Sequence, residues 1–464
     1  MEVGTVWKPV ISDHRKPAYL AIADALAGDL KTGRLRPGDA LPTQRALAEI
    51  LGINVTTVAR AYGEAARRGL VEATVGRGTV VRTPAEEDGA SLRGRHRELT
   101  DRTMNLPPEP VDAGLRARMR GSFEEIGGEI VSLMRYQSVG GSAADKAAAL
   151  RWLSRRGIES SAETLLIAPG THSALLAVLG EIARPGETVA CETITYPGIR
   201  AIAEQLGLRL AGLEEDRDGI DPAALARLAR TGAVRTLYLN PTVRNPTTDT
   251  MPMQRRAEVV EVARRYGVRI VEDDAYGFLP TDAPTALAML APELTFHVSG
   301  LAKSLGAGLR LAYLICPEQR MTRNVAGRLK TAAVMASPVT SALASRWIDT
   351  GLADDILSAV RAESAARRRI AADVLPAGLT RLDAESFHLW VRLPAGWTRA
   401  RIVDWMRGQS LGAVASDVFA LSEAPPEAFR LCLGGAASRL EARRSLEFLA
   451  DAFEHPPSRI HDGL

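Results

Sequence analysis

Residues 298–314, VSGLAKSLGAGLRLAYL, place a lysine and an arginine in a run of small residues that follows an apolar, strand-like segment. Lys303 lies among glycine, alanine and serine. A lysine desolvated in such a loop can act as an amine nucleophile toward an aldehyde and form a Schiff base. Arg310 offers a planar cation that suits a phosphate. A single loop lysine is more often a solvated surface charge, so the surrounding polar residues decide between the two interpretations.

Three other segments also place polar residues directly after strand-like runs. VRIVEDDAYGF ends its run in three acidic residues, 272–274, and carboxylates seldom follow such a run unless they meet a cation or a hydrogen-bond donor; a helix cap is the alternative. LYLNPTVRNPTTDT sets Asn240 and Asn245 before prolines, and turn chemistry is favoured for Asn240. TLLIAPGTHSALLAVLGEI predicts a helix that begins near Thr171, whose backbone N–H groups and dipole suit a phosphate.

The order of these residues along the chain matches the needs of one cofactor. Pyridoxal phosphate requires a phosphate cradle, a donor for its ring hydroxyl, a carboxylate that keeps its pyridine nitrogen protonated, and an amine for its aldehyde. The sequence therefore predicts a pyridoxal phosphate site that uses the helix start near Thr171, an asparagine at 240 or 245, an acidic residue of 272–274, Lys303 and Arg310.

From about residue 104 onward, apolar strand runs alternate with helical patterns, which predicts an α/β fold with a mixed, mostly parallel sheet covered on both faces. Ligands of such sheets collect at the carboxyl ends of strands. Residues 83–103 mix both charges and have almost no apolar periodicity, so they are interpreted as a linker. The predicted domains are thus residues 1–82, a linker at 83–103, and residues 104–464 with a smaller C-terminal lobe.

The first 82 residues carry 12 basic against 8 acidic residues, a local surplus that favours a phosphate-facing surface. Helical patterns meet at a turn near Gly52, and residues 70–81 alternate as a hairpin, which predicts a winged helix-turn-helix that binds double-stranded DNA. Helix caps and solvated charges are the alternative for each single residue. The candidate DNA-binding residues are Thr43, Arg45, Asn54, Thr56, Thr57, Arg60 and Arg77.

The segments PTQRALAEIL, TVARAY and GRGTVV resemble the winged helix of the GntR family of bacterial transcription regulators. Many members carry an arginine where this chain has Val55, so Arg60 or Arg45 is expected to supply more of the base contact.

The larger part resembles the fold-type I aminotransferases through Tyr136, GTHSAL, TYPG, NPT, EDDAY, K…GLR and RLCLG. The resemblance implies that Lys303 holds pyridoxal phosphate as an internal aldimine and that Asp273 pairs with the pyridinium. Asn245 then donates to the ring oxygen, with Tyr276 beside it.

The same resemblance assigns roles to the remaining motif residues. Tyr196 would stack on the ring and Arg430 would bind the carboxylate of an amino acid, whereas Tyr136 would reach the phosphate of a partner subunit in a homodimer. The residues implied to hold the phosphate are Thr171, His172 and Arg310.

Two positions depart from the pattern of these aminotransferases. Many relatives have hydroxyl residues where this chain has Gly300 and Ala302, which predicts the loss of a phosphate hydrogen bond worth roughly 0.5–1.5 kcal/mol.

A winged helix fused to an aminotransferase-like domain resembles the MocR branch of the GntR family. It implies a cytoplasmic, homodimeric transcription regulator that senses pyridoxal phosphate, with an amino acid or amine effector acting by aldimine exchange at Lys303. An active aminotransferase with a DNA-binding appendage is the alternative. No apolar run is long enough to span a membrane, and Cys191, Cys316 and Cys432 lack metal-ligand spacing, so no metal is expected.

Overall fold

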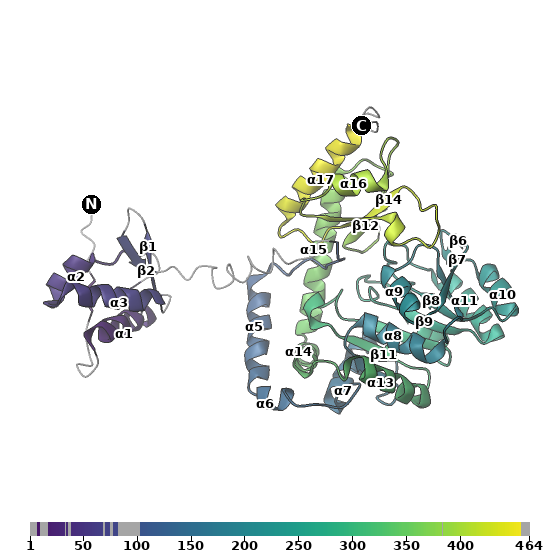
Figure 1. Ribbon diagram of the computed structural model, residues 1–464, viewed down its shortest axis with the longest axis horizontal. Helices are drawn as coiled ribbons and strands as arrows, with labels where there is room; N and C mark the ends of the chain where they lie inside the picture. The colour runs from purple at the N-terminus through teal and green to yellow at the C-terminus, as the bar shows by residue number, and fades with distance from the viewer. Residues whose placement is uncertain are drawn as a thin grey trace. The chain divides into compact units, whose positions relative to one another are not determined.

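A computed structural model describes residues 7–9, 17–32, 34–35, 39–67, 70–74, 78–81, 103–382 and 384–455. The chain divides into two compact units, residues 1–100 and 101–464, whose elements are labelled in Figure 1. Apart from Thr103, the linker predicted at residues 83–103 lies outside the described residues and stays a prediction.

The first unit contains the predicted helix-turn-helix and hairpin. Helix α1 spans Ala18–Lys31, α2 spans Gln44–Leu51 and α3 spans Val55–Arg67. Strands β1 (Val71–Thr74) and β2 (Gly78–Val81) pair antiparallel and form the stem of the wing. The predicted winged-helix order of elements is therefore confirmed.

A small apolar core fixes the angle between these helices. Gly52 ends α2 in the left-handed conformation, with φ 64°, which glycine adopts without the steric cost that a Cβ imposes. The chain can therefore turn at once into α3. Apolar side chains from all three helices and from the hairpin meet beneath this turn; they include Ile22, Leu26, Leu47, Val58, Tyr62 and Val81.

The second unit is built on a seven-stranded sheet of order β3-β11-β10-β9-β8-β4-β5. Its strands are β3 (Leu165–Ala168), β4 (Thr188–Glu192), β5 (Arg209–Leu213), β8 (Val234–Leu239), β9 (Arg269–Asp273), β10 (Thr295–Gly300) and β11 (Ala312–Ile315). Only β11 runs antiparallel to its neighbours, and the other pairs are parallel. The prediction of a mixed, mostly parallel sheet is confirmed.

Helices cover both faces of this sheet (Figure 1). Because side chains alternate between the faces of a strand, Leu165 and Ile167 join one core cluster while Leu166 and Ala168 join another. The helices that pack around the sheet and beside it are α5 (Ala113–Gly127), α6 (Ile130–Leu133), α7 (Ala143–Ser154), α8 (Thr171–Ile182), α9 (Pro197–Gln205), α10 (Pro222–Arg230), α11 (Met253–Tyr266), α12 (Leu287–Leu290), α13 (Gln319–Ala333) and α14 (Pro338–Asp349).

The long helix α15 (Leu352–Val374) leads from the large sheet to a smaller lobe, drawn toward the yellow end of the colour range in Figure 1. This lobe has a three-stranded antiparallel sheet of order β12-β14-β13 with its own apolar core. Its elements are β12 (His388–Arg392), α16 (Arg399–Trp405), β13 (Gly412–Ala415), β14 (Ala428–Cys432) and α17 (Arg439–Glu454). Of the helices that the structure describes, none has the length and apolarity needed to cross a membrane.

Parallel pairing brings three strand ends together. Strands β8, β9 and β10 are neighbours in the sheet and point the same way, so the residues that follow them emerge along one edge. That edge is where the polar residues predicted from the sequence are located.

Trp152 offers a test of the core between α7 and the sheet. Its side chain is fully buried and stacks on Phe278, with 4.6 Å between the ring centroids. We expect Trp152→Ala to lower the free energy of unfolding by about 3–5 kcal/mol, because the large side chain leaves a cavity. Urea unfolding at equilibrium measures this. Trp405 is 44% exposed, so Trp405→Ala is the control; equal losses from the two variants would contradict the packing.

Candidate functional site

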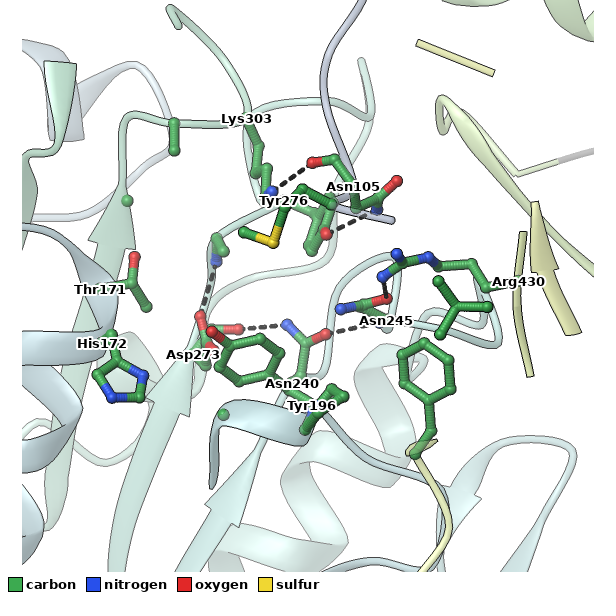
Figure 2. A pocket seen from close by; sticks show the side chains of 18 of the residues that line it. Asn105, Thr171, His172, Tyr196, Asn240, Asn245, Asp273, Tyr276, Lys303 and Arg430 are labelled. Atoms are coloured by element: carbon green, nitrogen blue, oxygen red, sulfur yellow. Dashed lines mark hydrogen bonds between the residues drawn. The ribbon is translucent and has the colours of Figure 1, made fainter. Parts of the chain in front are cut away.

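A cavity of about 590 Å³ opens at the edge where β8, β9 and β10 end. It is lined by residues that follow these strands, by the start of α8 and by the smaller lobe (Figure 2). Nine of the residues that the sequence assigned to cofactor and effector binding line it: Thr171, His172, Tyr196, Asn245, Asp273, Tyr276, Lys303, Arg310 and Arg430.

Lys303 follows the end of β10 and turns its amine into this cavity. Its Nζ donates a hydrogen bond of 2.5 Å to the backbone oxygen of Asn105 and lies 5.8 Å from the centre of the Tyr276 ring. Burial and the positive charge of Arg430 lower the pKa of Lys303 to about 8. A substantial fraction of the amine is therefore uncharged near neutral pH, as a nucleophile requires.

Asp273 is the last residue of β9 and is 4% exposed. One carboxylate oxygen accepts from the Tyr238 hydroxyl at 2.9 Å, and the other accepts from the backbone N–H of Ala275 at 3.2 Å. Burial raises the pKa of Asp273 to about 6. A cationic partner would lower that pKa again, so the carboxylate is suited to a protonated ring nitrogen.

Two asparagines brace the loop that follows β8. The Asn240 side chain donates to the backbone oxygen of Asp273 at 2.6 Å and accepts from the backbone N–H of Asn245 at 2.8 Å. It thereby joins two strand ends, in keeping with the turn role predicted for it. The Asn245 side-chain oxygen accepts from Arg430 at 3.1 Å. The Asn245 amide group thus lies between the arginine and the rest of the cavity (Figure 2).

The start of α8 forms a cradle at one side of the cavity, with Thr171 as its first residue. Gly170 precedes it with φ 94°, and Arg310 packs closely enough that a Cβ on Gly170 would lie 3.4 Å from Nη2. Burial and the charge of Arg310 lower the pKa of His172. A helix start, a hydroxyl and a guanidinium suit a phosphate.

Gly300 changes the interpretation of the missing hydroxyl. A Cβ on Gly300 would lie only 2.2 Å from the Thr171 hydroxyl oxygen, so any side chain there would displace Thr171. The hydroxyl of Thr171 therefore occupies the space that the Cβ of a larger residue at position 300 would need. The donor set of the cavity fits pyridoxal phosphate: a phosphate cradle, an amide, a buried carboxylate and an amine.

Two tyrosines border the region between the cradle and Arg430. Tyr196 precedes α9 and folds over Gly198, where a Cβ would lie 2.2 Å from its ring. Burial and the charge of Asp273 raise the pKa of Tyr196. The Tyr276 hydroxyl accepts a hydrogen bond from Asn105 at 2.8 Å.

Arg430 lies on β14 and is 4% exposed. Besides Asn245, it donates to the backbone oxygen of Thr103, and its guanidinium lies 5.2 Å from the Phe419 ring. Figure 2 shows Thr171 and His172 on the side of Asp273 away from Arg430. A ligand with a phosphate at one end and a carboxylate at the other would match this separation of cations.

Tyr136 lies elsewhere, with 87% of its side chain exposed, and does not line the cavity. Its predicted role concerns a partner subunit and stays a prediction. Exposed apolar neighbours surround it in sequence, among them Val131 and Met134, which are 72% and 66% exposed.

The candidate DNA-binding residues lie around the turn between α2 and α3. The Thr43 hydroxyl accepts from the backbone of Ala46 at 3.2 Å, and the Asn54 side chain accepts from the backbone N–H of Thr56 at 2.9 Å. Both residues are therefore helix caps, whatever else they contact. Arg45 and Thr56 are exposed, Thr57 is partly buried, and Arg60 lies over the Tyr19 ring at 5.6 Å. Arg77 lies outside the described residues.

Thr103 and Asn105 are among the contributors to the cavity that were not expected from the sequence. Thr103 is the last residue of the predicted linker and Asn105 lies just after it, and both reach the site through backbone oxygens. Backbone contacts leave no signature in residue type, so the sequence offered no signal for them.

Family models match both units. The model described as bacterial regulatory proteins, gntR family, matches residues 18–81, and the model for aminotransferase class I and II matches residues 105–446.

Relatives share this arrangement along most of their length. The chain is 30% identical over 423 residues to the HTH-type transcriptional regulator YdeF of Bacillus subtilis, covering 91% of each chain. It is 29% identical over 329 residues to the HTH-type transcriptional regulator TauR of Rhodobacter capsulatus, covering 62% of this chain and 65% of TauR. The probable rhizopine catabolism regulatory protein MocR of Rhizobium meliloti is 25% identical over 329 residues, covering 65% of this chain and 66% of MocR.

Among solved structures, an archaeal alanine:glyoxylate aminotransferase superposes with a TM-score of 0.68 at 23% identity, covering 79% of this chain and 95% of that chain. The second unit therefore has the fold of a fold-type I aminotransferase. Together with the winged helix, this shows that the chain belongs to the GntR-type HTH transcriptional regulators that carry an aminotransferase class I and II domain, the group that includes MocR and TauR.

Proposed function

We propose that the chain is a transcription regulator that binds pyridoxal phosphate at Lys303 and responds to an amino acid or amine that competes with Lys303 for the cofactor's aldehyde. The observation that carries the proposal is the convergence of Lys303, Asp273, Asn245 and Arg430 in one cavity. These residues are widely separated in the sequence. The winged helix is the part of the chain that would bind DNA in response to the ligand.

The residues have separate tasks toward the cofactor. When bound, pyridoxal phosphate supplies an aldehyde that condenses with amines. Thr171 and Arg310 hold the phosphate, and Asp273 holds the proton on the ring nitrogen. Tyr196 and the buried walls of the cavity keep water from the amine of Lys303, through which the cofactor is attached to the protein.

Arg430 makes an amino acid the better effector. Its guanidinium can form two parallel hydrogen bonds with a carboxylate, and Asn245 already orients one of its nitrogens. A ligand that carries both an amine and a carboxylate would contact the cofactor's aldehyde with one group and Arg430 with the other. The difference between its affinities for two conformations of the protein sets how far it can shift the equilibrium between them.

A homodimer supports the DNA-binding role, because two winged helices can read repeated half-sites. Exposed apolar residues gather along α5, α6 and the segment that follows, and contiguous patches of this kind mark protein interfaces. The most exposed are Phe123, Val131, Met134 and Tyr136. Such an interface would bring Tyr136 close to a partner subunit.

Transamination is the second candidate function, and the complete set of amine, carboxylate and guanidinium in the cavity favours it. Turnover with a panel of amino acids and 2-oxo acids separates the two candidates. Enzyme rates on the order of 1–10³ per second, together with no specific binding to the DNA upstream of its own gene, would establish the enzyme and overturn the regulator.

Replacement of Lys303 tests the covalent link. We expect Lys303→Ala to abolish the visible absorbance that pyridoxal phosphate gives when it is attached to the protein, because no other lysine among the described residues lines the cavity. Lys330→Ala is the matched control, since Lys330 is exposed on α13, and it should keep the band. An unchanged spectrum in Lys303→Ala would end the covalent interpretation.

The rate of cofactor attachment should depend on pH. The uncharged amine is the attacking form, so the rate of band formation in cofactor-free protein should rise with pH and level off above about 8, the lowered pKa of Lys303. Arg430→Gln should move the midpoint upward, because Arg430 adds to the effect of burial. Stopped-flow absorbance measures both curves; a midpoint that stays in place after the substitution would refute the electrostatic coupling.

DNA binding can be tested at an exposed arginine of α2. We expect Arg45→Ala to weaken binding to the DNA upstream of the gene by about 1–3 kcal/mol if Arg45 contacts a base, and to reduce the salt slope by about one if it contacts a phosphate. Fluorescence anisotropy over a range of salt distinguishes the two. Arg34→Ala serves as the control, since Arg34 pairs with Asp29 at 2.7 Å. Equal affinities for both variants would remove Arg45 from the interface.

A further inference from the structure

Residues 103–106, which we call the strap, cross the cavity at two of its cationic side chains, Lys303 and Arg430. The backbone oxygen of Asn105 accepts from Lys303 at 2.5 Å, and the backbone oxygen of Thr103 accepts from Arg430. Figure 2 shows Asn105 directly beside the Lys303 amine. The strap thus accepts hydrogen bonds from the two groups that the proposed function assigns to the cofactor's aldehyde and to an effector's carboxylate.

The Asn105 side chain anchors the strap to the cavity wall. It is 4% exposed, and its amide nitrogen lies 2.8 Å from the Tyr276 hydroxyl and 3.0 Å from Nδ1 of His388. Burial and the charge of Arg430 lower the pKa of His388 to about 3, so its ring is uncharged at neutral pH and Nδ1 can accept from Asn105. Two acceptors therefore hold one amide group.

Close packing fixes the position of Leu106, at the other end of the strap. A Cβ on Gly434 would lie 1.8 Å from the backbone oxygen of Leu106, and the Leu106 N–H lies 3.4 Å from the sulfur of Cys432. Leu106 is therefore fixed against the smaller lobe. Movement of the strap is therefore confined to the residues before Leu106, from Thr103 to Asn105.

Cofactor attachment removes the contact at Asn105. A neutral lysine amine that condenses with an aldehyde gains a carbon–nitrogen double bond, and both of its N–H hydrogens leave with the aldehyde oxygen as water. The nitrogen then carries at most one proton, which the carbonyl of Asn105 must share with other acceptors. When the amine of an amino acid displaces Lys303, the lysine regains both N–H bonds and can donate to Asn105 again.

Carboxylate binding weakens the contact at Thr103. A carboxylate is a stronger partner for a guanidinium than a backbone carbonyl is, because both members of the pair are charged. A carboxylate bound to Arg430 therefore competes with the backbone oxygen of Thr103. An amine without a carboxylate would leave that hydrogen bond in place.

We propose that exchange of Lys303 for an amino acid moves the attachment of the strap from Thr103 to Asn105, and so releases the hydrogen bond between Arg430 and Thr103, the described residue of this unit that is nearest in sequence to the winged helix. This inference rests on the proposed function. The carboxylate, rather than the amine, then carries the signal to the DNA-binding unit.

Two reduced adducts of the cofactor separate these contacts in the full-length chain. Phosphopyridoxyl-L-leucine carries a carboxylate, and phosphopyridoxyl-isopentylamine is the same adduct without it. Neither has an aldehyde, so Lys303 stays a free amine with both. We expect only the leucine adduct to raise hydrogen exchange at Thr103 and Met104, about tenfold for the loss of a charge-assisted hydrogen bond, and only that adduct to change the affinity for the upstream DNA.

Asn105→Leu tests the anchor, because leucine has a similar size and lacks the amide. We expect exchange in the strap to be raised with either adduct, so that the two no longer differ in exchange or in DNA affinity. Glu109→Ala is the control from the same segment, since Glu109 is exposed, and it should still distinguish the adducts. The adduct comparison in the unchanged chain stands by itself if Asn105→Leu does not fold.

The outcomes separate the strap from the proposed function. If both adducts bind and alter exchange and DNA affinity equally, or if exchange at Thr103 is unaffected, the strap proposal is wrong while the sensor remains. If neither adduct binds, or if no specific DNA binding is found, the proposed function fails first. An Asn105→Leu chain that distinguishes the adducts as the unchanged chain does would remove Asn105 as the anchor.

Discussion

Burial of two like charges, Lys303 and Arg430, in one cavity is the constraint on which the site depends. A buried charge without partners costs several kcal/mol, and two cations also repel each other. Arg430 is stabilised by the side chain of Asn245 and the backbone of Thr103. Lys303 donates a hydrogen bond to one backbone oxygen, and its pKa is lowered. The amine is therefore the group that gives up its proton, and it becomes the nucleophile.

Sheet register decides which acidic residue faces the cavity. Successive residues of a strand point to opposite faces, so Asp273 and Glu272 cannot both do so. Glu272 is fully buried beneath, where it accepts from the backbone at the start of α12 and pairs with His297 at 2.8 Å. A shift of one residue would bury Asp273 there instead. The ion pair thus helps to fix the register that presents Asp273 to a ligand.

The sequence predicted the residues that follow strands and missed those that act through the backbone. Asp273 and Lys303 stand out because polar residues after apolar runs need partners, and the parallel sheet was readable from the alternation of strands and helices. Asn105 lies in a segment without apolar periodicity. It is separated from Lys303, which it contacts, by 198 positions in the sequence. The packing of Leu106 against Gly434 and the hydrogen bonds of the Asn105 side chain hold its carbonyl there. The helix caps at Thr43 and Asn54 were predicted, whereas the stacking of Arg60 on Tyr19 depends on how α1 and α3 pack.

The departure at Gly300 shows how the site differs from the aminotransferases it resembles. The sequence alone indicated a lost hydroxyl, yet the Thr171 hydroxyl fills the space that a side chain at 300 would need. The departure therefore leaves room for the Thr171 hydroxyl, and the predicted loss of a phosphate hydrogen bond stays a prediction. The strap, residues 103–106, also crosses the cavity, because Lys303 and Arg430 donate hydrogen bonds to the backbone oxygens of Asn105 and Thr103. Under the proposed function, a ligand that competes for these contacts would act on residues 103–106.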